Sequence, residues 1–134
     1  MALISIQRSR ILLAEDDPAF RRLLATALTA DGHEVVAVAS GNELLGVIGD
    51  AGSGRARWAF DLVISDVRMP GRSGLEVLRG LRRSASSPPF VLITAFGDEE
   101  LHEEAQRLGA AAVVDKPFEI DDLRRTIDTL LAGR

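Results

Sequence analysis

The sequence predicts an α/β fold in which helices cover both faces of a five-stranded parallel sheet. Five short apolar runs alternate with five segments of helical character, and such alternation is typical of parallel sheets. Within each run the apolar residues are continuous, as expected of strands buried on both faces. With 134 residues, of which 46% are hydrophobic, the chain is long enough for one compact domain with its own core.

The predicted strands are the five apolar runs themselves. Each has three to five residues and is rich in Val, Ile, Leu or Ala, which suits a short buried strand. The runs cover residues 11–14, 35–39, 62–64, 90–93 and 111–114.

The first helix has a clear start signal. Asp17 is expected to be its N-cap, with Pro18 at the first helical position. Apolar residues then recur within 20–28 at helical spacing and form one stripe. Residues 49–57 (GDAGSGRAR) are the one loose stretch, and they predict a surface loop between the second helix and the third strand.

The other helices also begin at capping residues. Residues 40–43 (SGNE) and 73–76 (SGLE) each read as a capping box that opens a helix. Asp98 is expected to cap a fourth helix, which Gly109 ends. A fifth helix follows from the apolar stripe within residues 123–131.

Composition excludes several classes of protein. Charged residues make up 27% and the formal net charge is -4, whereas a nucleic-acid-binding surface is usually basic. The absence of cysteine rules out disulfides, thiolate metal sites and a Cys nucleophile. No apolar run approaches the length of a membrane span, and the N-terminus lacks the pattern of a secretory signal. We therefore expect a soluble, cytoplasmic protein with neither nucleic acid nor membrane as a direct partner.

Polar residues follow four of the predicted strands. They are Glu15-Asp16-Asp17, Ser65-Asp66, Thr94-Ala95 and Asp115-Lys116-Pro117. Because ligands of open α/β sheets bind beyond the carboxyl ends of the strands, we expect these carboxylates, one hydroxyl and one ammonium to converge on one rim.

The chemistry of this set favours phosphoryl transfer. Clustered carboxylates repel one another, and a hard divalent cation such as Mg²⁺ or Mn²⁺ would relieve the repulsion. Lys116 can pair with a phosphoryl oxygen and Thr94 can donate its hydroxyl to another. Asp66 is then the candidate nucleophile, which would form an acyl phosphate.

Each residue taken singly has a commoner structural explanation. Asp17 before Pro18 is expected to be only a helix cap, and Gly71 and Gly74 are assigned turn and helix-entry roles, since they complete no phosphate-binding fingerprint. The functional interpretation depends on the combination, in which four separate strand ends supply complementary groups.

The motifs ILLAEDD, LVISDVRMPGRSGLEVL, VLITA and VVDKPF resemble, in order and spacing, the receiver (CheY-like) domain of two-component response regulators. The resemblance runs from about Arg10 to Leu131, and it is closest to receivers of nitrogen-regulator-type transcription factors. It implies a flavodoxin-like (βα)5 fold with strand order 2-1-3-4-5 and a single receiver domain over residues 1–134 with its core at about 10–131.

The resemblance also implies a function for the strand ends. Asp66 would accept a phosphoryl group from the phosphohistidine of a sensor histidine kinase or phosphotransfer protein. Thr94 and Lys116 would contact that group and act in the switch. The domain would catalyse both its own phosphorylation and its dephosphorylation, and the Lys116–Pro117 peptide bond would be cis.

The metal ligands and the residues that tune dephosphorylation are likewise implied by the resemblance. Glu15, Asp16, Asp66 and the backbone carbonyl of Arg68 would hold Mg²⁺. Arg68 and Phe96 stand two residues after Asp66 and Thr94, at positions that tune dephosphorylation in this family.

One position departs from the family pattern. Val113 stands where an aromatic residue usually changes rotamer together with the switch hydroxyl. Phosphorylation should survive, because no phosphoryl contact is lost. Val113 leaves open the route by which the signal reaches the surface of the fourth helix, fifth strand and fifth helix. The alternative is a phosphorylation-independent pseudo-receiver that binds proteins.

A haloacid-dehalogenase-type phosphatase is disfavoured, because Arg68 stands where its general acid is needed. The context of the domain and its oligomeric state remain open at the level of sequence. The chain is expected to be either a single-domain regulator or an N-terminal module. Acidic residues 98–100 and the basic pair Arg124 and Arg125 raise the hypothesis of a homodimer that forms on phosphorylation.

Overall fold

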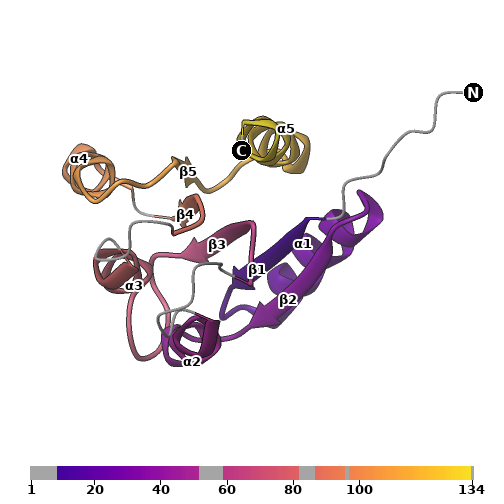
Figure 1. Cartoon of the computed structure of the whole chain (residues 1–134). Coiled ribbons are helices and arrows are strands. Elements are labelled where there is room, and N and C mark those ends of the chain that lie inside the picture. Colours follow the sequence, from indigo (N-terminus) through magenta and orange to yellow (C-terminus); the bar gives the residue numbers. More distant parts are fainter. Residues whose placement is uncertain (1–8, 52–58, 82–86, 96, 134) are drawn as a thin grey trace, which may run out of the picture.

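The computed structural model describes residues 9–51, 59–81, 87–95 and 97–133, and the chain forms one sheet flanked by helices (Figure 1). The strands are β1 (Arg10–Ala14), β2 (Glu34–Val38), β3 (Leu62–Asp66), β4 (Phe90–Thr94) and β5 (Ala112–Asp115). The helices are α1 (Pro18–Ala30), α2 (Gly41–Ala51), α3 (Gly74–Leu81), α4 (Glu99–Arg107) and α5 (Ile120–Ala132).

The sheet topology confirms the predicted fold. All five strands are parallel and lie in the order β2-β1-β3-β4-β5. The strand order reverses between β1 and β3, and such a switch point is where open α/β sheets bind ligands.

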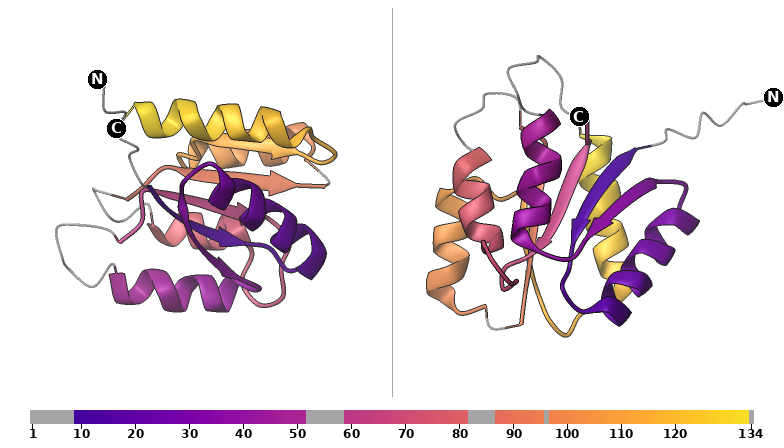
Figure 2. Two further views of the ribbon diagram at one scale, coloured as in Figure 1. Left: turned by 90° about the vertical axis from the view of Figure 1, so that its right-hand side faces the viewer. Right: turned by 90° about the horizontal axis from the view of Figure 1, so that it is seen from below.

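Helices cover the two faces of the sheet in separate layers, with α1 and α5 on one face and α2, α3 and α4 on the other (Figure 2). Successive strand residues supply the two layers in turn. Ile11 and Leu13 pack in the α1–α5 layer, whereas Leu12 and Ala14 pack in the α2–α3–α4 layer. This alternation explains why the strands read as continuous apolar runs.

The predicted capping interactions form. The Asp17 carboxylate accepts hydrogen bonds from the amides of Ala19 and Phe20. At the start of α3, the Glu76 amide donates to Ser73 Oγ while the Ser73 amide donates to Glu76 Oε1, which is a complete capping box. At the start of α2, the Glu43 amide donates to Ser40 Oγ as predicted, whereas the side chain of Glu43 accepts from the amide of Ala39 rather than of Ser40.

Several boundaries differ from the prediction. Strand β1 begins at Arg10, and β3 and β4 continue to Asp66 and Thr94. Helix α2 continues to Ala51, so residues 49–51 are not a loop, and residues 52–58 lie outside the described part of the chain. Strand β2 begins at Glu34, whose amide donates to Ser9 O, and ends at Val38. Strand β5 covers Ala112–Asp115 rather than 111–114. Backbone hydrogen bonds to the neighbouring strand set the ends of the strands, and the polarity of the side chains does not indicate where this pairing stops.

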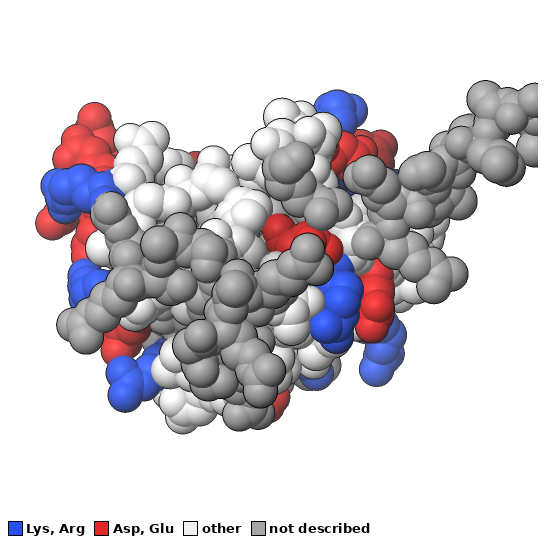
Figure 3. All heavy atoms as spheres, viewed as in Figure 1, with Lys and Arg blue, Asp and Glu red and all other residues white. Residues whose placement is uncertain are grey.

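Charges on the surface are mixed in sign. In the view of Figure 3, Lys and Arg side chains stand next to Asp and Glu side chains around the described part of this face. Among the described residues, no helix combines the length and the apolar character that a bilayer crossing requires.

Candidate functional site

The strand-end residues predicted from the sequence meet at one edge of the sheet. Asp66 is the last residue of β3 and Thr94 the last of β4. Beyond these ends the ladder continues, because the Val67 amide donates to Ile93 O and the Lys116 amide donates to Thr94 O. The backbone that carries the site is therefore held by the sheet itself.

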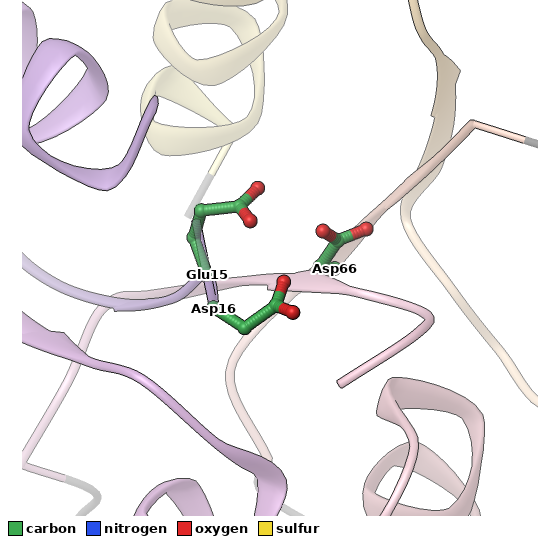
Figure 4. A group of neighbouring side chains, drawn as sticks. All are labelled: Glu15, Asp16 and Asp66. Atoms are coloured by element: carbon green, nitrogen blue, oxygen red, sulfur yellow. The ribbon is translucent and has the colours of Figure 1, made fainter. Parts of the chain in front are cut away.

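Three carboxylates form the centre of this edge. One oxygen from each of Glu15, Asp16 and Asp66 lies within 4.8 Å of the others, and the three side chains point toward a common space (Figure 4). Glu15 and Asp66 are only 1% and 7% exposed. Asp16 is exposed, and within the described part of the chain its carboxylate has no hydrogen-bond or ion-pair partner.

Lys116 joins two of these acids. Its Nζ lies 3.2 Å from Glu15 Oε1 and 3.1 Å from Asp66 Oδ2. Burial lowers the pKa of the Lys116 ammonium, but the hydrogen bonds and negative charges of Asp66 and Glu15 outweigh it, so the pKa is raised above its ordinary value. The ammonium is therefore charged at neutral pH and offsets part of the acidic cluster.

Glu15 is the acid of this set whose pKa is raised. Burial, together with the nearby charge of Asp66, raises its pKa from 4.5 to about 7, against the lowering effects of the Asp17 amide and of Lys116. One ammonium thus does not compensate all of the negative charge that burial concentrates here.

The donor set fits a hard divalent cation. All three side chains offer carboxylate oxygens, the ligands that Mg²⁺ prefers, and the raised pKa of Glu15 shows that further positive charge would be stabilising. Arg68, two residues after Asp66, is exposed; the role of its carbonyl as a further ligand stays a prediction.

Thr94 and Val113 have different surroundings. Thr94 is 1% exposed. Val113 is half-buried and packs against the core of the α2–α3–α4 layer.

The Lys116–Pro117 peptide bond is cis, the isomer that the resemblance implied. Phe96, the second predicted tuning position, lies outside the described residues.

Gly74 packs directly under the nucleophile candidate. Its amide donates to Val67 O, and a Cβ at this position would lie 2.5 Å from Asp66 O and 2.9 Å from Ser65 Oγ. The hydroxyl of Ser65 donates to the same Asp66 carbonyl at 2.9 Å. Gly74 was assigned a helix-entry role only, and the structure adds this close approach.

Sequence reasoning missed two groups near the site. Phe20 was expected only in the apolar stripe of α1, yet Lys116 Nζ lies 4.7 Å from its ring centroid. His102 received no role, yet its Nε2 lies 3.0 Å from Asp115 Oδ1. In the sequence, nothing local distinguishes Phe20 from the core residues of the same apolar stripe.

Comparison with known proteins identifies one family. A family model described as "Response regulator receiver domain" matches residues 11–128. The response regulator protein FleR of Pseudomonas aeruginosa is 44% identical over 111 residues, which are 83% of this chain and 22% of FleR. The regulatory protein AtoC of Escherichia coli is 32% identical, over 92% of this chain and 25% of AtoC. The chain thus spans about a quarter of the length of these relatives.

Solved structures agree with the sequence matches. The response regulator TrrA of Thermotoga maritima, in complex with Mg²⁺-BeF, superposes with a TM-score of 0.75 at 33% identity, covering 91% of this chain and 98% of that one. The chemotaxis response regulator CheY4 of Vibrio cholerae gives a TM-score of 0.77 at 28% identity, covering 92% and 99%.

Proposed function

The chain belongs to the response regulator receiver domain family, and on that premise we propose that Asp66 is its phosphoacceptor residue. A receiver domain is the phosphoacceptor of two-component signalling, so the open question is which atoms of this chain act. The observation that carries the proposal is the position of Asp66. Its carboxylate is almost fully buried, lies 3.1 Å from an ammonium and shares a cation-sized space with Glu15 and Asp16.

In the proposed reaction, a carboxylate oxygen of Asp66 attacks the phosphorus of a phosphohistidine on a histidine kinase or phosphotransfer protein. The new O–P bond replaces the N–P bond, and the histidine nitrogen leaves with the electron pair. Lys116 stands 3.1 Å from Asp66 Oδ2, where it can turn from the carboxylate to an oxygen of the incoming group. Thr94, at the end of the adjacent strand, supplies the hydroxyl.

Glu15, Asp16 and Asp66 would hold Mg²⁺, with the Arg68 carbonyl as a further ligand; Mn²⁺ would suit the same oxygen donors. When bound, the cation offsets negative charge that develops on the transferring group. Glu15 must lose its proton for this role, which its pKa of about 7 permits near neutrality. Hydrolysis of the acyl phosphate would reset the site, with Arg68 and Phe96 tuning its rate.

The consequence of phosphorylation would be a shift of the α4–β5–α5 surface between two arrangements. The phosphoryl group adds roughly -1.5 to -2 charge at neutral pH, by analogy with other phosphorylated side chains. Thr94 pairs with Asp115 of β5, so the site borders this surface. Because several relatives are named as transcriptional regulators, we propose an output of that kind through a longer protein or a partner, with the cytoplasm as the place of action.

The test is the intact mass of the protein after incubation with acetyl phosphate, with and without Mg²⁺. We expect a gain of one phosphoryl mass that requires Mg²⁺ and is absent in Asp66→Ala. Asp128→Asn, a change on α5, is the control for a generic loss of an acidic residue and should be phosphorylated like the wild type.

A protein that binds Mg²⁺ but gains no mass from acetyl phosphate or from a panel of phosphorylated kinases would contradict the proposal. That result would favour the alternative, a protein-binding module that works without phosphorylation.

A further inference from the structure

The start of α1 lies against the polar site. The Asp17 amide donates to Glu15 Oε2 at 3.0 Å, and Arg21 Nη1 donates to the Glu15 carbonyl at 2.8 Å. Between these two residues, Phe20 presents its ring to the ammonium of Lys116, with Nζ 4.7 Å from the ring centroid. One helical turn therefore contacts both Glu15 and Lys116.

The ring of Phe20 is itself braced. Phe118, two residues after Lys116, meets it edge to face, with centroids 5.7 Å apart and an interplanar angle of 67°. Edge-to-face contacts of this kind are favourable. Both rings lie at the margin of the α1–α5 core layer. Lys116 Nζ consequently contacts an aromatic ring and two carboxylates.

A lysine ammonium at a phosphoryl site needs an external constraint. The side chain has four flexible methylenes and three rotatable donors, and here it is 26% exposed. Its two carboxylate partners compete for it, since Glu15 Oε1 and Asp66 Oδ2 lie at nearly equal distances. Phosphorylation of Asp66 would convert its carboxylate to an acyl phosphate, so the ammonium would have to move to a phosphoryl oxygen while Glu15 still attracts it.

We propose that Phe20 is a positioning residue for Lys116: its ring face fixes the ammonium beside Asp66, before and after the phosphoryl group arrives, by a cation–π contact. This inference rests on the proposed function, because it assumes that Lys116 serves phosphoryl transfer. The competing explanation is that Phe20 only fills space in the apolar stripe of α1. The two differ in whether the aromatic face, rather than apolar volume, is what the site requires.

A series at position 20 separates them. Phe20→Leu and Phe20→Met keep an apolar side chain without a ring, whereas Phe20→Tyr and Phe20→Trp keep the ring. We expect the rate of Mg²⁺-dependent phosphorylation by acetyl phosphate to fall roughly two- to fivefold in the Leu and Met variants, the effect of a partly exposed cation–π contact. The Tyr and Trp variants should stay near the wild-type rate. Leu24→Met, a core change in the same helix, controls for altered packing of α1.

A second readout needs no phosphorylation. Lys116 is the only lysine in the chain, so protein labelled with ¹³C-lysine gives one side-chain spin system. The ring should shift the Lys116 ε-methylene signals upfield in the wild type and the Tyr variant, and this shift should vanish in the Leu variant.

Equal phosphorylation rates across the series, or ε-methylene signals that do not respond to loss of the ring, would overturn the inference. Failure of the wild type to become phosphorylated would instead count against the proposed function. The lysine signals would still report whether the ring holds the ammonium.

Discussion

At the level of single residues, the contact between Gly74 and Asp66 is the tightest steric constraint on the candidate phosphoacceptor. The helix entry at Gly74 lies against the carbonyl of Asp66, and a Cβ would approach it to 2.5 Å. Because the carbonyl of Asp66 belongs to backbone that is hydrogen-bonded in the sheet, it cannot move aside without a cost in free energy. A methyl group at this position must shift either the start of α3 or Asp66.

Gly74→Ala is therefore expected to lower the free energy of unfolding by about 1–3 kcal/mol, as overpacking does, and to slow phosphorylation of Asp66. Gly80→Ala is the matched control, since it lies in the same helix and a Cβ there meets nothing within 4 Å. That change should stabilise the protein by roughly 0.5–1 kcal/mol. Urea unfolding with intact-mass phosphorylation measures both effects, and equal behaviour of the two variants would refute the steric argument.

The polar centre of the site could be predicted residue by residue from the sequence. Glu15, Asp66, Thr94 and Lys116 stand at strand ends, and parallel strands bring their carboxyl ends to one edge. The contact of Phe20 in α1 with Lys116 could not be predicted, because a Phe in an apolar stripe is normally a core residue. Whether Phe20 faces the core or an ammonium depends on where β5 carries Lys116, and the local pattern contains no such information.

At the level of elements, the five strands and five helices were predictable because apolar runs and capping residues are local signals. The ends of β2 and β5 were not, because hydrogen bonds to the adjacent strand decide them. The pairing of Glu34 with Arg10 extends β2 beyond its apolar run. Likewise, the pairing of Asp115 with Thr94 carries β5 to an exposed acid.

Helix α4 is joined to the end of β5 by a polar pair. His102 Nε2 contacts both carboxylate oxygens of Asp115, at 3.0 and 3.1 Å. Gly97 lies against this pair, and a Cβ there would overlap Asp115 Oδ1. On the same strand, Val113 offers no aromatic ring toward α4. The His102–Asp115 pair is consequently a direct polar link between this helix and the sheet.

A double-mutant cycle with His102→Ala and Asp115→Ala should give a coupling energy of about 0.5–1 kcal/mol, because both side chains are partly exposed. Hydrogen exchange in α4 should speed up equally in either single variant. Arg79→Ala serves as the control, because it breaks an ion pair that links α4 to α3. The free-energy changes of Arg79→Ala and His102→Ala should simply add. If the changes of His102→Ala and Asp115→Ala also added, the His102–Asp115 pair would contribute nothing to stability.

At the level of the whole molecule, the basic residues of the dimer hypothesis, Arg124 and Arg125, are engaged within the chain. Arg124 makes a two-point contact with Asp31 at the end of α1, with both distances 2.9 Å, and Arg125 pairs with Asp122. The Arg124–Asp31 contact ties α5 to the end of α1 on one face of the sheet, whereas the Arg125–Asp122 pair lies within α5. An intermolecular pairing of Arg124 with the acidic start of α4 would first have to break this link, so phosphorylation-dependent dimerisation stays a prediction.

The free energy of unfolding of the metal-free protein should depend on pH through Glu15. Its pKa rises from 4.5 to about 7 on folding, so between these values the folded state holds a proton that the unfolded state has released. Raising the pH through this window therefore favours unfolding. The loss should be on the order of 3 kcal/mol at most, from about 1.4 kcal/mol per pH unit.

Urea titrations in EDTA between pH 4.5 and 8 measure this slope, and Glu15→Gln should flatten it while the exposed control Glu103→Gln should not. Saturating Mg²⁺ should also flatten it, because a bound cation favours the ionised carboxylate. The apparent affinity for Mg²⁺ should accordingly rise with pH through about 7. A Glu15→Gln variant with the wild-type slope would show that the burial of this acid is not what makes the site demand positive charge.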